Sequence, residues 1–190
     1  MMIIGVTGLM GSGKGAVADI LIEKGFVKLG HSESIDEELQ RRGLACTREN
    51  QVAVANEMRQ KQGSDYLAKK LLEKIEPTKN YVIEGFRNVA EIEVFRNRPD
   101  FILIGVAAGR KRRFEWLRIR DRLGDPKTKE EFEKVEKRDF LQQAPYGQQN
   151  ALCFALAERY FLNEGNFEEL KKQVEEFLRT LAVKNTTAPQ

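Results

Sequence analysis

The 190-residue chain is long enough for one compact domain, which we expect over residues 1–183, and its 41% of apolar residues allows a core without disulfide or metal cross-links. Lys and Arg number 32 against 29 Asp and Glu, and a net charge of +3 does not by itself indicate a nucleic-acid partner. One histidine and two widely spaced cysteines argue against a Cys/His metal site and indicate reduced thiols in the cytoplasm.

Short apolar runs mark the predicted strands, and these runs are continuous and not alternating. Such runs are typical of strands that are covered on both faces in a parallel sheet. Segments of helical period separate them, which predicts right-handed crossovers with helices on both sides of the sheet. The predicted fold is therefore a three-layer α/β/α domain with a five-stranded parallel sheet. Its strands are expected at residues 2–6, 26–29 (the weakest), 81–83, 101–106 and 160–162.

The N-terminus has no basic region before its apolar run, so it is expected to be a strand and not a signal peptide. No stretch approaches the roughly 18 apolar residues of a membrane span. We therefore expect a soluble, cytoplasmic protein without a membrane partner.

A glycine-rich loop follows the first strand, at residues 8–15 with the sequence Gly-Leu-Met-Gly-Ser-Gly-Lys-Gly. It matches the phosphate-loop pattern, in which backbone N–H groups surround phosphate oxygens and the lysine, here Lys14, reaches the outer phosphates. The loop opens a helix whose dipole favours negative charge and which is expected to end at Gly25. A glycine-rich turn with an incidental lysine is the alternative interpretation.

The position after Lys14 usually carries a Ser or Thr that binds magnesium, and here it is Gly15. The loop resembles that of the adenylate kinases, in which a threonine follows this glycine, but Ala16 replaces that threonine. We therefore expect Mg²⁺ to be held mainly by the phosphates of ATP, by water and by a carboxylate. The predicted nucleotide-binding residues of the loop are Gly8, Leu9, Met10, Gly11, Ser12, Gly13, Lys14, Gly15 and Ala16.

A long helical insertion is expected at about residues 34–75, interrupted near Gly43 and Gly63. The resemblance implies that this insertion holds the acceptor and determines substrate choice. Where the adenylate kinases have Thr-Gly-Asp-Leu-Leu-Arg, this chain has His-Ser-Glu-Ser-Ile-Asp, and Asp36 replaces the arginine that would bind the phosphate of AMP. His31 could be a base or a hydrogen-bonding group, or an ordinary loop histidine.

The segment Tyr-Val-Ile-Glu-Gly-Phe-Arg places Glu84 and Arg87 just beyond a buried strand. Ligands of open parallel sheets collect at the carboxyl ends of the strands, so both side chains should face the crevice of the loop. Glu84 could hold a water on Mg²⁺ or orient the acceptor, and Arg87 could hold an acceptor phosphate. This segment resembles the adenylate kinase phrase whose arginine binds the acceptor. The alternative is that the two side chains merely pair with each other or cap helices.

The most basic stretch of the chain lies at residues 110–122. Its apolar residues recur at helical spacing, which predicts an amphipathic helix docked on the core through Phe114, Trp116, Leu117, Ile119 and Leu123. Arginines beside a phosphate loop suit phosphoryl transfer, and the resemblance implies a mobile lid at about residues 118–138. The lid candidates are Arg120, Arg122 and Arg138. A nucleic-acid patch and a solvated face are the alternatives.

Two capping patterns predict the starts of later helices. Thr128 pairs with Glu131, in a helix expected to end by residue 145, and Asn166 pairs with Glu169 at the start of the last helix. Residues 184–190 form a polar tail that we expect to be disordered.

Together these segments resemble the adenylate kinase-related and dephospho-CoA kinase-like P-loop proteins found widely in archaea. The resemblance implies that residues 163–166, with Asn163 foremost, lie near the adenine, and that Lys14, Arg87, Arg120 and Arg122 are catalytic. We expect an ATP- and Mg²⁺-dependent kinase of a small phosphate-bearing acceptor, a nucleoside monophosphate or a dephospho-CoA-like molecule, acting as a monomer or homodimer. An ATPase or switch that acts on a macromolecular partner is the second hypothesis, and a nucleic-acid-binding module, which we do not expect, is the third.

Overall fold

The computed structural model describes residues 1–122 and 124–186. The described strands form one sheet: β1 (Ile3–Thr7), β2 (Phe26–Gly30), β3 (Asn80–Glu84), β4 (Phe101–Ala107) and β5 (Arg159–Leu162). Their order in the sheet is β2-β3-β1-β4-β5, and all neighbouring pairs are parallel. The predicted five-stranded parallel α/β fold is confirmed, and each predicted strand end lies within one residue of the observed one.

The described helices alternate with these strands and fall into two groups. Those of the central layers are α1 (Lys14–Glu23), α4 (Tyr66–Leu72), α5 (Val89–Arg96), α8 (Asn150–Ala155) and α9 (Phe167–Thr186). Those beyond the sheet are α2 (His31–Arg41), α3 (Arg48–Gln62), α6 (Arg110–Arg120) and α7 (Lys129–Phe140). Helices α2 to α4 occupy the predicted insertion, and Gly43 and Gly63, both at positive φ, lie in the turns between them.

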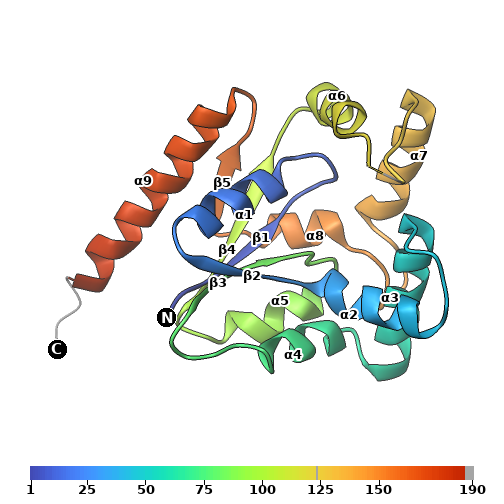
Figure 1. Cartoon of the computed structure of the whole chain (residues 1–190), viewed down its shortest axis with the longest axis horizontal. Helices are drawn as coiled ribbons and strands as arrows, with labels where there is room; N and C mark the ends of the chain where they lie inside the picture. Colours follow the sequence, from blue (N-terminus) through green and yellow to red (C-terminus); the bar gives the residue numbers. More distant parts are fainter. Residues whose placement is uncertain (123, 187–190) are drawn as a thin grey trace.

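Helices cover both faces of the sheet (Figure 1). On one face, α1 and α9 pack on strand residues such as Ile4 and Val106. On the other face, α4, α5 and α8 pack on residues such as Ile3 and Leu103. The adjacent residues Ile3 and Ile4 point to opposite faces and both are fully buried. This double burial explains why the strands are apolar throughout.

The strands end together at one edge of the sheet, because neighbouring strands run in register. Val6 pairs with Glu84 at the end of β3, and Thr7 pairs with Gly105 near the end of β4. The glycine loop and Glu84 therefore lie at the same edge. Figure 1 shows α6 and α7 beyond this edge, with α7 above α3 along the right-hand side.

Two small apolar clusters hold the outer helices in place. Helices α2, α3 and α4 share one cluster around Leu39 and Leu67. The other joins Met10 of the glycine loop to Leu117 of α6 and Phe132 of α7. The phosphate loop is thus packed directly against the predicted lid region.

The predicted helix ends agree with the structure where capping residues define them. Thr128 Oγ1 accepts from the N–H of Glu131, and Asn166 Oδ1 accepts from the N–H of Glu169. Helix α1 ends before Gly25, which has a φ of 88°. These local patterns were sufficient to predict the helix ends because each cap satisfies a backbone group that the helix itself leaves unpaired.

Two predictions near helix ends need correction, and one lies outside the described residues. Ile119 is 80% exposed and does not dock on the core, because the buried side of α6 is the one that carries Arg113 and Leu117. Helix α9 continues to Thr186, so part of the expected polar tail is helical. Leu123 and residues 187–190 lie outside the described residues.

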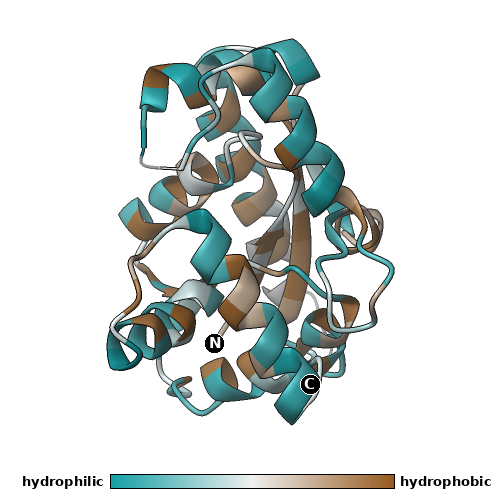
Figure 2. Cartoon of the chain, turned by 90° about the vertical axis from the view of Figure 1, so that its right-hand side faces the viewer, coloured by the Kyte–Doolittle hydropathy of each residue, from teal (hydrophilic) through white to brown (hydrophobic). Residues whose placement is uncertain are grey.

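The hydropathy colouring in Figure 2 shows apolar strands at the centre and polar outer surfaces on most helices. Among residues 1–122 and 124–186, no helix has the length and apolar character needed to cross a membrane. Cys46 and Cys153 are free thiols, one exposed and one buried.

Candidate active site

The side chain of Lys14 is hydrogen-bonded to the start of the glycine loop. Its Nζ donates hydrogen bonds to the carbonyl oxygens of Gly8 and Leu9, both at 2.9 Å. Since Lys14 is the first residue of α1, its amine sits where the positive end of the helix dipole meets the loop. The loop is therefore already folded around the side chain that is expected to meet a phosphate.

Two glycines let neighbouring elements approach the loop closely. Gly13 has a φ of 99°, and a Cβ atom there would lie 2.1 Å from Nδ2 of Asn163. Gly11 has a φ of 76°, and a Cβ atom there would lie 2.7 Å from the carbonyl oxygen of Arg113. Residues with side chains rarely adopt such φ values, so both positions require glycine for conformation and for space.

Two side chains from distant segments tether the loop. Asn163, directly after β5, donates from Nδ2 to the carbonyl oxygen of Ser12 at 3.0 Å. Arg113 of α6 donates from Nη1 to the carbonyl oxygen of Met10 at 3.1 Å and also pairs with Glu136 of α7. The loop is thereby fixed between the sheet and helices α6 and α7.

Two adjoining clefts open at this edge of the sheet. The first, of about 630 Å³, lies along the glycine loop and reaches α6 and the start of α9. The second, of about 670 Å³, reaches α2 and α3 of the insertion. Seven side chains border both clefts: Lys14, Lys28, Arg48, Glu84, Arg87, Arg120 and Arg122. Six of these seven are basic, so the junction of the clefts favours anionic ligands.

The predicted loop residues divide between lining and supporting positions. Those that border the first cleft are Met10, Gly11, Gly13, Lys14, Gly15 and Ala16, together with Asn163. Gly8, Leu9 and Ser12 do not border it, and Ser12 is only 1% exposed. Gly8 lies against the carbonyl oxygen of Val106 in β4, where a Cβ atom would be 2.4 Å away. These three residues therefore support the loop on the side away from the cleft.

Crowding of cations perturbs the basic groups at the junction. Burial, reinforced by the nearby Arg87, Arg48 and Arg120, lowers the pKa of Lys14 to about 7, although Glu84 opposes the shift. Burial and the adjacent Arg48 also lower the pKa of Arg87. A neutral amine still has two N–H groups for the Gly8 and Leu9 carbonyls. The cations repel one another here, and an added anion would relieve that repulsion.

Arg87 is held by a buried network behind the clefts. Its Nη1 donates to Oδ1 of Asn150 at 3.2 Å, and its backbone N–H donates to Oε2 of Glu91 at 2.8 Å. Glu91 in turn forms a fully buried ion pair with Arg59 of α3, with 2.8 Å between Nη2 and Oε1. The guanidinium is thus held by α8, and the backbone that carries it is held by Glu91 of α5; Arg87 borders both clefts, as the sequence predicts.

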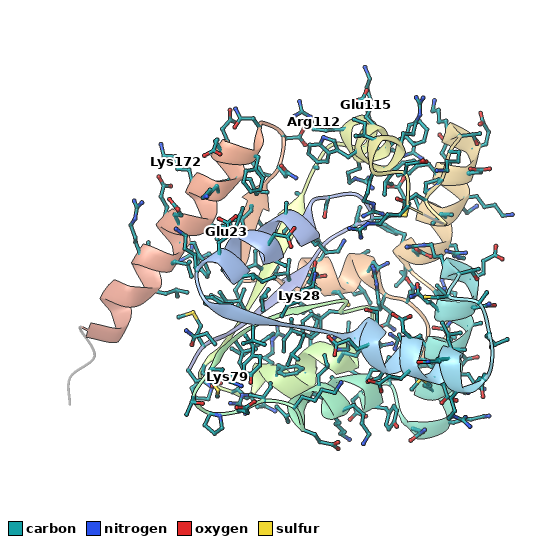
Figure 3. All side chains as sticks on the ribbon, in the orientation of Figure 1. Glu23, Lys28, Lys79, Arg112, Glu115 and Lys172 are labelled. Carbon is teal, nitrogen blue, oxygen red and sulfur yellow. The ribbon has the colours of Figure 1, made fainter. Side chains whose placement is uncertain are left out.

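Glu84 faces both clefts but is not paired with Arg87. Its Oε2 lies 2.5 Å from Nζ of Lys28 on β2. Figure 3 shows Lys28 near the middle of the molecule, and Arg112 on the side of α6 that faces the start of α9.

Within the described part of the chain, no group of three or more His, Cys, Asp or Glu side chains is arranged as a metal site.

The predicted lid arginines lie in different surroundings. Arg120 and Arg122 border both clefts, and Asp125 accepts from Nε of Arg120 at 2.9 Å and from the backbone N–H of Arg122 at 3.2 Å. Arg138 borders neither cleft and instead pairs with Asp139 at 2.8 Å. The structure therefore brings together the first two arginines and not the third.

His31 lies at the start of α2 and borders the second cleft. Its ring is only 2% exposed and packs edge-on against Phe86, with 4.8 Å between ring centroids. Mainly burial, aided by Arg59 and Arg87, lowers the pKa of His31, although Glu91 and a backbone hydrogen bond oppose the shift. The imidazole is therefore a neutral, buried group and not an ordinary loop histidine.

Sequence reasoning missed Lys28 and Arg48 as site residues. Lys28 interrupts the apolar strand β2. Because lysine is rarely found in a buried strand, its presence there indicates a site residue. Arg48 is the first residue of α3, after the cap Thr47, where a cation opposes the helix dipole. Arg48 pairs with Asp139 at the end of α7 and so joins the insertion to the lid region. Asp36, which replaces the expected arginine, instead accepts from Gln51 at 2.7 Å.

Comparison with known proteins identifies the family and the fold of this chain. The family AAA_18, described as an AAA domain, matches residues 4–140. The UPF0200 protein of Methanothermobacter thermautotrophicus is 34% identical over 187 residues, which cover 97% of this chain and 93% of that protein. Two solved structures share the fold at low identity. A gluconokinase from Sinorhizobium meliloti 1021 has a TM-score of 0.59 at 13% identity, covering 100% of this chain and 98% of that one. A shikimate kinase from Acinetobacter baumannii in complex with shikimate has a TM-score of 0.58 at 15% identity, covering 98% of this chain and 96% of that one.

Proposed function

Because this chain belongs to the UPF0200 family and has the AAA domain on a P-loop kinase-like fold, we propose that it is an ATP-dependent small-molecule kinase. It transfers the γ-phosphoryl group to a small phosphate-bearing acceptor, a nucleoside monophosphate or a dephospho-CoA-like molecule. The observation that carries the proposal is the pair of clefts that meet at Lys14, Arg87 and the lid arginines.

ATP occupies the first cleft in this proposal. Its phosphates lie on the loop and on the N-terminus of α1, and its base lies near Asn163, where Trp116 and Phe167 supply aromatic surface. The tethers from Asn163 and Arg113 keep the loop in place as the phosphates bind. Lys14 exchanges its bonds to the loop carbonyls for bonds to the outer phosphates.

The acceptor occupies the second cleft. Its phosphate lies between Arg87, which follows β3, and Arg48, the first residue of α3, two of the basic side chains that border this cleft. Arg48 takes the role that Asp36 cannot fill. Phosphoryl transfer then forms a bond from the acceptor oxygen to the γ-phosphorus and breaks the bond to the bridging oxygen, which leaves with ADP. Where the acceptor oxygen belongs to a hydroxyl group, its proton is released to solvent. Lys14, Arg120 and Arg122 balance the charge that spreads over the moving group.

The residues present fit a Mg²⁺ ion that the nucleotide brings with it. Gly15 and Ala16 offer no side-chain oxygen, and Glu84 is the carboxylate that borders both clefts. Mg²⁺ commonly keeps several waters and binds one or two carboxylates besides phosphates. Glu84 would hold such a water, and the ion would supply neutralisation of phosphate charge.

Incubation with labelled ATP and a panel of nucleoside monophosphates and dephospho-CoA tests this function. We expect transfer to at least one acceptor, and Lys14→Ala should abolish it. Arg87→Ala should raise the apparent KM for the acceptor roughly 10-fold or more, since it removes charge-assisted hydrogen bonds. Arg98→Ala is a matched control, because Arg98 pairs with Asp100 before β4 and borders neither cleft.

The outcomes separate the competing functions. Slow ATP hydrolysis without transfer to any acceptor would contradict the kinase and favour an ATPase or switch with a macromolecular partner. An unchanged acceptor KM in Arg87→Ala would remove Arg87 from the acceptor site and leave the kinase assignment standing. Salt-sensitive binding of nucleic acid without ATP would favour the basic helix as a nucleic-acid surface.

A further inference from the structure

His31 combines a satisfied nitrogen with an unsatisfied one. Its Nδ1 lies 3.0 Å from the backbone carbonyl oxygen of Glu84. Among the described residues, no group lies within hydrogen-bonding distance of its Nε2, which is buried. A buried polar atom left without a partner costs roughly 1–3 kcal/mol, so a ligand that supplies the missing partner gains affinity.

The Glu84 carbonyl determines which nitrogen of the ring carries the proton. A carbonyl oxygen only accepts hydrogen bonds, so Nδ1 must be the donor. In a neutral imidazole the other nitrogen is then an acceptor with a free lone pair. Nε2 of His31 therefore requires a hydrogen-bond donor, which a fully ionised phosphate does not provide.

The other groups around the second cleft narrow the class of donor. Seven basic side chains border it, among them Arg48, Arg87 and Lys28, against the two carboxylates of Glu33 and Glu84, so the cleft favours an anion. The same cations repel an ammonium group, so the donor beside the anion is neutral. Hydroxyl groups and the N–H groups of a nucleobase are both neutral donors. Of the two, the hydroxyl group is the one that every acceptor with a sugar or alcohol unit carries.

We infer that His31 is a specificity residue whose Nε2 accepts a hydrogen bond from a hydroxyl group of the acceptor, so that the second cleft selects phosphate-bearing alcohols. This inference rests on the proposed function, since it concerns the acceptor cleft of the proposed kinase. His31 and the arginines then recognise two different parts of one molecule. The hydroxyl-bearing part lies toward Glu84 and Phe86, and the phosphate lies toward Arg48 and Arg87.

NMR tests the inference directly, because His31 is the only histidine of the chain. Protein labelled with ¹⁵N-histidine should show a protonated Nδ1 and an unprotonated Nε2. The probes are AMP and glycerol 3-phosphate, with 2′,3′-dideoxy-AMP and propyl phosphate as their respective partners that lack the hydroxyl groups. At least one hydroxyl-bearing probe should shift the Nε2 signal more than its hydroxyl-free partner does. A protonated Nε2, or no hydroxyl-dependent shift with any probe, would overturn the inference.

Two substitutions separate recognition from a merely structural role. In His31→Asn the side-chain amide can still donate to the Glu84 carbonyl, but the Nε2 position is lost. In His31→Gln the amide oxygen can reach the Nε2 position and restore an acceptor. We expect His31→Asn to weaken binding of the hydroxyl-bearing probe about 10-fold and to leave its hydroxyl-free partner unchanged. His31→Gln should recover part of the loss, and equal affinities for both probes in the wild-type protein would contradict the inference.

Failure of this inference and failure of the proposed function give different results. If His31→Asn keeps the hydroxyl preference while labelled ATP still phosphorylates an acceptor, the kinase stands and the role of His31 is wrong. If no acceptor is phosphorylated but the Nε2 signal responds to a hydroxyl, the cleft recognises alcohols and the kinase assignment is wrong.

Discussion

Asn163 and Ser12 are 151 residues apart in the chain, yet Nδ2 of Asn163 donates to the carbonyl oxygen of Ser12 at 3.0 Å. This bond joins the end of β5 to the phosphate loop. Asn163 is only 7% exposed, so its amide is held firmly against Gly13. The resemblance to adenylate kinases implies that Asn163 lies near the base of the nucleotide, and the structure shows that it also bonds directly to the loop.

Asn163→Ala should weaken both the fold and the binding of ATP. The change leaves the Ser12 carbonyl unpaired and should cost about 1–2 kcal/mol of unfolding free energy, together with a several-fold loss of ATP affinity. Calorimetric titration with ATP and thermal unfolding measure the two effects. Asn80→Ala is the control, because Asn80 accepts from Met2 at the opposite edge of the sheet. Equal ATP affinity in wild type and Asn163→Ala would show that the tether does not support binding.

Gly13→Ala and Gly15→Ala should have opposite effects within one loop. A methyl group at Gly13 would combine an unfavourable φ with a 2.1 Å clash, so loss of ATP binding and a lower Tm are expected. No atom lies within 4 Å of a Cβ at Gly15, and its φ is not positive, so Gly15→Ala should raise stability by about 0.5–1 kcal/mol. Thermal unfolding of both variants tests this, and a destabilised Gly15→Ala would contradict the open space at that position.

Binding of ATP should take up a proton at Lys14. In the free protein the pKa of Lys14 is about 7, so the amine is mostly neutral above that pH. Phosphates favour the charged ammonium, so the pKa rises on binding and ATP affinity should fall as the pH increases from about 7 toward 10. Calorimetry at pH 8 in two buffers of different ionisation enthalpy measures the uptake. Lys14→Met should show none, and an uptake of zero in the wild type would contradict the prediction.

Glu91→Gln should destabilise the protein strongly. The change leaves Arg59 buried without its anion and should cost about 3–5 kcal/mol, or roughly 10 °C in Tm for a chain of this size. Thermal unfolding measures the loss. Glu93→Gln, on the exposed side of the same helix, is the matched control and should stay within about 0.5 kcal/mol.

The stability of the wild-type protein should fall in acid because of the same carboxylate, Glu91. Although burial alone would raise the pKa of Glu91, Arg59 and the backbone N–H of Arg87 hold it below the usual 4.5. Since the folded form binds this proton less readily than the unfolded form, stability from Glu91 is present above about pH 4.5 and is lost as the pH falls further. Unfolding titrations from pH 6 to 3 measure it, and Glu91→Gln should reduce this acid dependence.

Much of the fold could be predicted because its signals are local. The strands are apolar through Ile3 and Ile4 alike because both faces of the sheet are covered, and the caps at Thr128 and Asn166 act within four residues. The glycine loop was also recognisable, since Lys14 and its glycines occupy fixed spacings after a strand. Ile119 was placed wrongly because helical spacing does not say how much of a helix meets the core.

The sequence by itself thus determined the sheet, the phosphate loop and the basic character of α6, because each depends on neighbouring residues. Only the tertiary structure decided that Arg48 and Lys28 join the site and that Arg138 does not. It also gave His31 a paired and an unpaired nitrogen through a contact with Glu84, 53 residues away. Such pairings depend on how α2, α3 and α7 pack beyond the sheet, and no spacing within a single segment contains that information.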